Sequence, residues 1–253
     1  MSSFRERLYL STIDDNAPAL ARSFGLGLEI AQFCTAMNMD EGFAGTNAKT
    51  LSAMEGVERF TFHAPFSELC PAAIDPLVRE ITSRRYTQAI ALSKSYGIKK
   101  IVIHSGFIPM VYFPEWFVPE SIAFWKEFLR GADSDITICL ENVMEPDADM
   151  LVDIAAGVDD ARLRLCLDMG HANTRVSAAP VTEWIRKMAP WLSHIHIHNN
   201  DGDSDLHRPL GEGILDYTAL LAESESLCAD VTYTVENMAA AASVDWLREN
   251  DYL

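Results

Sequence analysis

Short runs of β-branched and apolar residues recur along the chain and alternate with stretches of helical character. This alternation is typical of repeated βα units that build a parallel sheet. There are eight such runs, which is the number that a closed barrel requires. They cover residues 7–12, 24–30, 60–64, 100–105, 136–143, 163–169, 194–199 and 231–237.

The helix predicted over 75–96 has clear start and stop signals. Asp75 suits the N-cap, Pro76 the first helical position and Gly97 a left-handed ending. Further helices are expected over 147–156, 181–188, 216–225 and 243–250. Since no linker or change of composition divides the chain, we expect one domain over 1–253, an α/β fold of the (β/α)8 TIM barrel type.

The histidines of the chain are not scattered at random relative to these runs. His63, His104 and His198 fall at or near predicted strand ends, and His171 and His207 follow in the loops. No histidine lies in a predicted amphipathic helix. Strand ends and βα loops build the active face of such a barrel, so this placement indicates a functional site.

Carboxylates share this placement. Glu141, Asp168 and Glu236 end three of the predicted strands, and Asp205 lies just before His207. Imidazole nitrogens and carboxylate oxygens together suit Zn, Mn, Fe or Co. Several carboxylates at one mouth would repel one another without cations. We therefore expect a divalent metal, zinc or manganese above all, with roughly one to three ions.

Strand alternation predicts which side chains lie deeper inside the barrel. Residues two positions before the strand-end ligands should face the same interior: Thr61, Val102, Cys139, Cys166, His196 and Thr234. Most are small or apolar, so Cys139 and Cys166 are interpreted as core thiols rather than ligands. His196 is the exception and is expected beneath the ligands or against substrate. His194 begins its strand and is expected to be structural.

Composition narrows the kind of partner. Hydrophobic residues make up 49% of the 253 residues and charged residues 23%, as in ordinary globular proteins. The net charge of −17 opposes binding of a nucleic acid backbone, which calls for a basic surface. A small-molecule substrate is therefore expected. The five cysteines include no CxxC pair, and no signal peptide or membrane-length apolar run is found, so we expect a cytoplasmic protein.

Two segments carry a resemblance to a known family: LCLDMGHAN at 165–173 and HIHNNDGDSDLHRPLGEG at 196–213. They resemble the xylose isomerase-like TIM barrel superfamily, which includes sugar-phosphate isomerases and epimerases and the endonuclease IV group of AP endonucleases. In the endonuclease IV enzymes nine side chains hold three zinc ions. The resemblance implies the corresponding ligands here: His63, His104, Glu141, Asp168, His171, His198, Asp205, His207 and Glu236.

The sugar epimerases of this superfamily use a smaller set of ligands around one metal. The resemblance assigns that set to Glu141, Asp168, His198 and Glu236, with the two glutamates as the catalytic acid–base pair. The DNA-repair members carry extra basic loops, whereas the segment after His63 contains no basic residue until Arg79.

Three functions follow as alternatives. The preferred one is a metal-dependent isomerase or epimerase of a small sugar, polyol or sugar phosphate, in which carboxylates move a proton. The second is a multinuclear zinc phosphoesterase. Its substrate would be small, because the sequence lacks the basic loops with which the DNA-repair members bind DNA. The third is a binding or sensor protein with a decayed site, which the complete ligand set argues against.

Four residues outside the ligand set are candidate substrate contacts: Glu29, His196, Arg208 and Trp116. Arg208 could bind a substrate oxygen or phosphate, or could be a solvated loop residue. Trp116 belongs to the aromatic segment 106–121, which is interpreted as a loop after the fourth strand. That loop could cover substrate, pack on its own barrel or form the contact of a homodimer.

Overall fold

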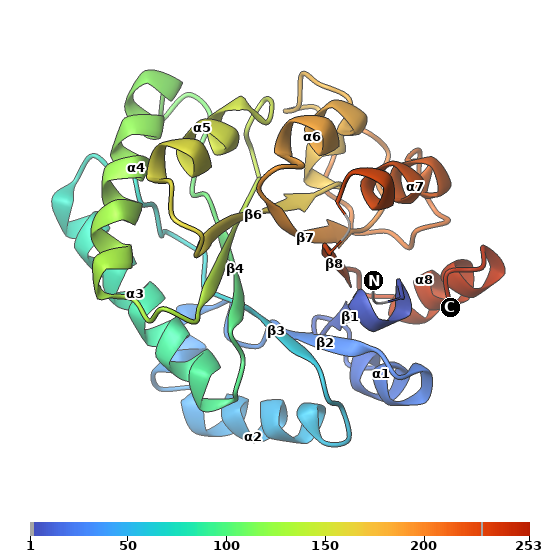
Figure 1. Ribbon diagram of the computed structural model, residues 1–253. Coiled ribbons are helices and arrows are strands. Elements are labelled where there is room, and N and C mark those ends of the chain that lie inside the picture. The colour runs from blue at the N-terminus through green and yellow to red at the C-terminus, as the bar shows by residue number, and fades with distance from the viewer. Residues whose placement is uncertain (1–2, 229) are drawn as a thin grey trace.

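The computed structural model describes residues 3–228 and 230–253. The domain predicted over 1–253 therefore lies within the described residues except at 1–2 and 229. Eight parallel strands pair in sequence order, and the last pairs with the first to close a barrel (Figure 1). The strands are β1 (Leu8–Ser11), β2 (Gly27–Ile30), β3 (Phe60–His63), β4 (Lys100–His104), β5 (Thr137–Glu141), β6 (Leu163–Asp168), β7 (Leu192–Ile197) and β8 (Thr232–Val235).

In the described parts of the chain, eight α-helices follow the strands in turn and surround the barrel (Figure 1). They are α1 (Ala17–Phe24), α2 (Phe43–Met54), α3 (Pro76–Ser95), α4 (Pro114–Gly131), α5 (Asp149–Val158), α6 (Val181–Met188), α7 (Tyr217–Leu227) and α8 (Ala240–Glu249). Short 3-10 turns occupy Arg5–Arg7, Ala36–Met39 and His171–Asn173. The predicted TIM barrel is thus confirmed. The rings of Phe4 and Tyr252 lie 5.1 Å apart, so the first described residues lie close to the C-terminal end. Within the described residues, no helix is long and apolar enough to cross a bilayer.

The main hydrophobic core lies between the strands and the helices, and a smaller buried cluster is separate from it. That cluster consists of Val102, Cys139 and Cys166, and all three side chains are fully buried. Alternation along the strands turns these residues away from the helices and into the barrel. The two thiols therefore pack in the interior, as predicted.

The third helix confirms the predicted capping signals. The Asp75 side chain accepts a hydrogen bond from the Leu77 amide, and Pro76 is the first helical residue. The helix ends before Gly97, whose φ of 76° is left-handed. This helix carries the chain from β3 back to the start of β4.

The prediction of a loop over 106–121 is wrong in its second half, because α4 begins at Pro114. Proline is tolerated in a first helical turn, where the amide has no partner to lose. Phe117, Ser121, Trp125 and Leu129 then form a buried stripe at helical spacing, and packing of this stripe outweighs the second proline at Pro119.

The strand predicted over 24–30 also begins too early. Phe24 is the last residue of α1, and Gly25 ends this helix with a φ of 63°. Strand β2 begins only at Gly27. A left-handed glycine directly after an apolar helical stripe is a helix ending, and the sequence interpretation took it as part of the strand.

Candidate metal centre

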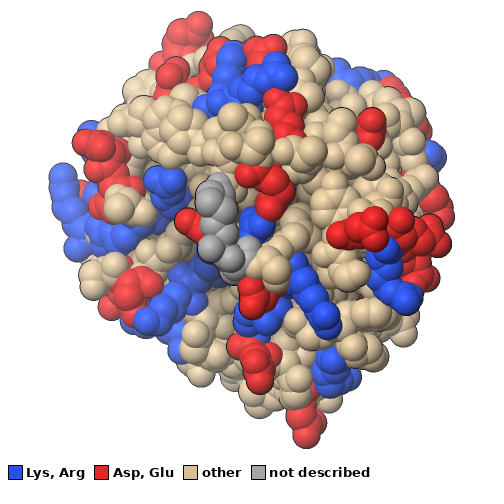
Figure 2. Space-filling model, turned by 45° about the vertical axis from the view of Figure 1, so that its right-hand side comes forward, with Lys and Arg blue, Asp and Glu red and all other residues tan. Residues whose placement is uncertain are grey.

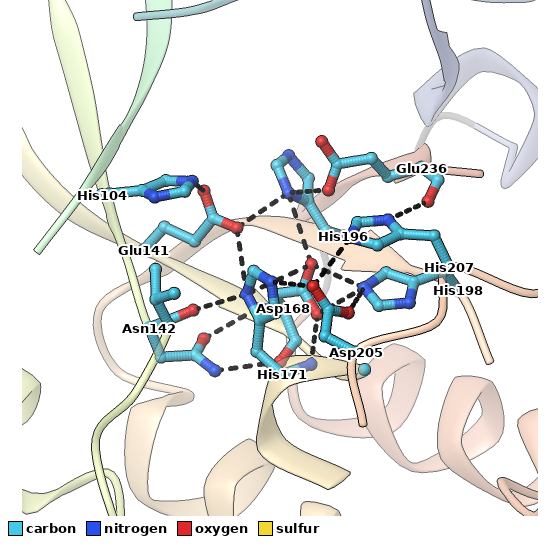
Figure 3. Close-up of polar contacts among 12 residues, drawn as sticks. His104, Glu141, Asn142, Asp168, His171, His196, His198, Asp205, His207 and Glu236 are labelled. Atoms are coloured by element: carbon cyan, nitrogen blue, oxygen red, sulfur yellow. Dashed lines mark hydrogen bonds and ion pairs between the residues drawn. The ribbon is translucent and has the colours of Figure 1, made fainter. Parts of the chain in front are cut away.

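The nine predicted ligands meet at the C-terminal ends of the strands. Four of them are the last residues of consecutive strands: His63, His104, Glu141 and Asp168 end β3, β4, β5 and β6. His198 and Glu236 directly follow β7 and β8, and His171, Asp205 and His207 come from the loops after β6 and β7. Figure 3 shows most of these side chains converging from different strands. The described residues offer groups of donor atoms close enough to share a cation, and three of these groups together contain all nine predicted ligands.

The first group contains His63, His104 and Glu141. The Nε2 atoms of both histidines lie 3.4 Å from Glu141 Oε2. This buried oxygen has no hydrogen-bond partner among the described residues. Zinc bonds of about 2.0–2.1 Å place neighbouring tetrahedral ligands about 3.4 Å apart, so the spacing fits a shared ion better than direct hydrogen bonds.

The second group lies at the centre of the barrel mouth and contains Glu141, Asp168, His196 and Glu236. His196 Nδ1 lies 3.2 Å from Glu141 Oε1, 3.1 Å from Glu236 Oε2 and 3.7 Å from Asp168 Oδ2. The structure thus places His196, rather than His198, between the two glutamates. A prediction from the resemblance placed His198 in this set.

The third group contains His171, His198, Asp205 and His207. Asp205 Oδ2 lies 3.2 Å from His171 Nε2 and 3.0 Å from His207 Nε2. His198 Nε2 lies 3.0 Å from Asp168 Oδ1 and 3.7 Å from Asp205 Oδ1, so it stands between the second and third groups. All nine predicted ligands therefore belong to one continuous cluster.

Three histidine rings of the cluster are oriented by backbone carbonyls. The Nδ1 atoms of His63, His171 and His207 donate to the carbonyl oxygens of Ala64, Asn142 and Glu236, at 2.9, 2.9 and 2.7 Å. Each bond fixes the proton on Nδ1 and leaves Nε2 facing the donor cluster. This arrangement is typical of metal-binding histidines and is independent of the resemblance.

The carboxylates of the cluster are ionised in spite of their burial. Burial raises the pKa of Glu141, but His196 and His104 outweigh that effect and hold the pKa well below its usual range. The pKa of Asp168 is likewise lowered, with burial opposed by His171 and His198. Buried, closely spaced anions need positive charge nearby. The donor set, its spacing and its charge together fit divalent metal, with nitrogen and oxygen ligands that suit zinc or manganese.

A buried column of polar side chains continues below the cluster. Glu29 Oε1 lies 3.1 Å from His196 Nε2, and Glu29 Oε2 lies 3.1 Å from His194 Nε2. His194 Nδ1 in turn lies 2.6 Å from the hydroxyl of Thr232, which accepts a hydrogen bond from Lys100. The sequence interpretation treated these residues separately. Their shared inward direction on alternate strand positions was the signal that could have joined them.

The four predicted substrate contacts lie in different places. Glu29 is fully buried beneath the donor cluster, and His196 belongs to that cluster. Trp116 lies on α4, where its Nε1 donates to the Ala72 carbonyl. Arg208 is part of the loop after β7, with its guanidinium 3.7 Å from Asp201. Neither Trp116 nor Arg208 belongs to the lining of the cavity described next.

A cavity of 750 Å³ opens over the donor cluster. Its base includes His63, His104, His171, His207 and Glu236, and its walls come from the loops that follow the strands. A second hollow of 890 Å³ lies between α3 and α4. None of the donor groups found in the described residues lines that second hollow, so the cavity at the barrel mouth is the candidate site.

Comparison with known proteins agrees with this architecture. The sequence pattern of the xylose isomerase-like TIM barrel family matches residues 25–249. The chain belongs to this family. The resemblance seen in the two sequence segments is therefore confirmed for almost the whole barrel, from the helix ending before β2 to the end of α8.

Among curated relatives of the chain is the uncharacterized protein MJ1311 of Methanocaldococcus jannaschii. It is 29% identical over 184 residues, which make up 69% of this chain and 63% of the relative. The chain spans less than two thirds of the length of the curated relatives it matches.

Two solved structures are similar over nearly the full length. The TTHB071 protein of Thermus thermophilus, in a crystal soaked with zinc chloride, is 25% identical with a TM-score of 0.78, and 98% of each chain is covered. A structure named D-tagatose 3-epimerase-like protein is 24% identical with a TM-score of 0.76, and 96% of each chain is covered. At this level of identity the second likeness establishes a common fold.

Proposed function

We propose that this protein is a divalent-metal-dependent isomerase or epimerase of a small hydroxycarbonyl compound, the chemical class that includes the ketoses. The observation that carries the proposal is the pair Glu141 and Glu236. Their carboxylates reach His196 Nδ1 from β5 and from the end of β8, at 3.2 and 3.1 Å. The name of the D-tagatose 3-epimerase-like neighbour supports the same class.

In this reaction the two carboxylates divide the proton transfer. One removes the proton from the carbon beside the carbonyl, and the other returns a proton to the opposite face or to the neighbouring carbon. Both start as anions, since the pKa of each is held below its usual range: burial raises it, but His196 beside each carboxylate outweighs that effect. The carboxylate that returns the proton therefore first takes one from solvent, and the carboxylate that removed the substrate proton later releases it to solvent. Bound divalent metal would polarise the carbonyl and hydroxyl oxygens and favour the charge that develops on them.

The test uses zinc- and manganese-loaded protein in deuterated water with a panel of ketoses, polyol ketones and hydroxyketones that carry an aryl or alkyl group. We expect deuterium to enter the carbon beside the carbonyl, detected by mass spectrometry, and an epimer or isomer to accumulate. Glu236→Gln removes the proton acceptor but keeps the shape, so exchange should fall about 10²–10⁴-fold. Metal content of the variant is measured by elemental analysis, so that loss of metal is distinguished from loss of the base.

Glu127→Gln is the matched control. Glu127 lies on the surface of α4, outside the cavity lining, and its side chain is 72% exposed, so its variant should exchange at the wild-type rate. Absence of deuterium incorporation by fully loaded wild-type protein across the panel would remove the proposed function.

A second candidate, a multinuclear zinc phosphoesterase, is favoured by the division of the nine predicted ligands among several donor groups. Centres with several metals are used for phosphoester hydrolysis. The net charge of −17 argues against a nucleic acid substrate, and basic and acidic side chains are interspersed on the face in Figure 2. Release of nitrophenol from bis(4-nitrophenyl) phosphate, together with three zinc ions per chain, would select this alternative.

A further inference from the structure

The cavity over the donor cluster has walls of a different chemistry from its base. Apart from the donors, the lining is dominated by apolar and aromatic side chains, among them Phe66, Phe107, Ile108, Met144, Leu206 and Met238. These come from the loops after β3, β4, β5, β7 and β8, so they enclose the mouth from several sides.

Several of these wall residues remain partly open to solvent. Phe66 is 37% exposed, Ile108 48%, Met144 44% and Met238 76%. Single exposed apolar residues are ordinary, but a group around one concave mouth marks a surface that a ligand covers. Phe66 also stacks on the His104 ring at 4.3 Å between centroids, so the apolar wall begins directly beside the donors.

The described lining residues include no lysine or arginine. Glu68 is the one charged side chain among them outside the donor groups. Arg175 and Arg208 follow β6 and β7 in the sequence, but they lie 3.5 Å from Asp203 and 3.7 Å from Asp201 and stay outside the lining. A phosphate carried on the body of a substrate would therefore meet no cationic side chain and would face a carboxylate.

The walls also offer few hydrogen-bond partners to the neutral hydroxyl groups of a substrate. The described lining contains no serine, threonine, asparagine or glutamine, and Tyr112 supplies its one hydroxyl group. Sugar hydroxyls held against these walls would find only Glu68 and Tyr112 as side-chain partners, so most would lose water without gaining a hydrogen bond, which costs free energy for each buried group. The walls thus disfavour both a phosphorylated and a heavily hydroxylated body.

We propose that the natural substrate is amphipathic, with an oxygen-bearing head that reaches the donor cluster and an uncharged aryl or alkyl body that fills the apolar cavity. The hydroxycarbonyl nature of the head rests on the proposed function, whereas the apolar body rests on the walls alone. The volume of 750 Å³ falls within the range of pockets that bury drug-sized ligands, so the body can be as large as one or more rings.

Hydroxamic acids test the cavity without any proton transfer to carbon, because they bind metal through a short oxygen-bearing head. We compare acetohydroxamic acid, benzohydroxamic acid and a phosphorylated hydroxamic acid by calorimetric titration of the zinc-loaded protein. Benzohydroxamic acid is expected to bind at least about tenfold more tightly than acetohydroxamic acid, since even one methylene in an apolar pocket is worth that factor. The phosphorylated probe should bind no more tightly than acetohydroxamic acid.

Two variants test whether the apolar walls cause the preference for benzohydroxamic acid over acetohydroxamic acid. Met144→Gln places an amide in the wall at nearly constant volume, so the preference for the benzo compound should fall. Met110→Gln is the matched control, because Met110 is 94% exposed in the loop after β4 and does not line the cavity. Its preference should equal that of the wild type.

Equal affinity for the aceto and benzo compounds, or tighter binding of the phosphorylated one, would overturn the proposal. Benzohydroxamic acid binding equally well to metal-free protein would also overturn it, because the head would then not reach the donors. Failure of the deuterium experiment leaves this result untouched, so the two proposals fail separately.

Discussion

Glu29→Ala is expected to destabilise the barrel far more than an ordinary glutamate substitution. The Glu29 carboxylate is fully buried and accepts from the hydroxyls of Thr61 and Thr234 at 3.1 and 3.3 Å. It also lies 3.1 Å from ring nitrogens of His194 and His196. Burial raises the pKa of Glu29, but His196 and His194 outweigh this and hold it well below its usual range, so the group is an anion at neutral pH.

Removing this fully buried carboxylate leaves the hydroxyls of Thr61 and Thr234 without their acceptor and the Nε2 atom of His196 without its anionic partner. Breaking a buried ion pair in this way costs about 3–5 kcal/mol of the free energy of unfolding. For a chain of this size each kcal/mol shifts the melting temperature by about 2–4 °C, so a decrease of about 10 °C is expected.

The measurement is urea unfolding of metal-free protein, followed by circular dichroism, with the slope of the transition compared between variants. Glu127→Ala is the control, because Glu127 pairs with Arg130 on the surface of α4 and its side chain is 72% exposed. Such an exposed pair is worth less than about 1 kcal/mol. If Glu29→Ala costs no more than this control, the column does not stabilise the barrel and the reasoning is wrong.

Three further predictions concern the donor cluster, with and without metal. Without metal, burial lowers the pKa of His63 and of His207, but Glu141 and Asp205 outweigh it and raise each pKa to about 9. Zinc binding at pH 7.5 should therefore release protons, and the affinity for zinc should increase up to about pH 9. Calorimetry in buffers of different ionisation enthalpy measures the number of protons released, and a value of zero would contradict the prediction. The same protons stabilise the metal-free fold most below pH 6.5, and this contribution is lost as the pH rises through about 9. Gly170→Ala would bring a Cβ within 2.0 Å of the His198 ring, so zinc content should fall, whereas Gly45→Ala meets no atom within 4 Å and should leave it unchanged.

The barrel could be predicted because buried parallel strands are nearly continuous apolar runs with clear turn signals between them. The first residue of a strand was harder to place: Gly25, with its left-handed φ, ends α1, although the sequence assigned it to the strand predicted over 24–30. Helix α4 was missed because Pro114 and Pro119 are breakers in an isolated sequence. Only the packing of Trp125 and Leu129 against the core decides that the helix forms there.

The donor cluster could be predicted for a similar reason: a residue at the end of a barrel strand reaches the mouth wherever that strand lies in the sequence. The position of His196 between Glu141 and Glu236 could not. The register of β6 with β7 shifts between Leu165 and Cys166, so that Asp168 is paired with His196. A bulge of this kind changes which residue of a strand reaches a given height, and alternation within one strand does not reveal it.

The base and the walls of the site therefore carry different information about function. The base is set by strand ends and by carbonyls that orient His63, His171 and His207, so any chain with this barrel and these residues can build it. The walls come from loops, which vary in length and sequence without disturbing the strands. Proteins with the same base can hence act on different substrates, and a likeness in fold does not carry over the nature of the substrate. For this chain the body has to be inferred from Phe66, Met144 and their neighbours, whose apolar character argues for a substrate less polar than a free sugar.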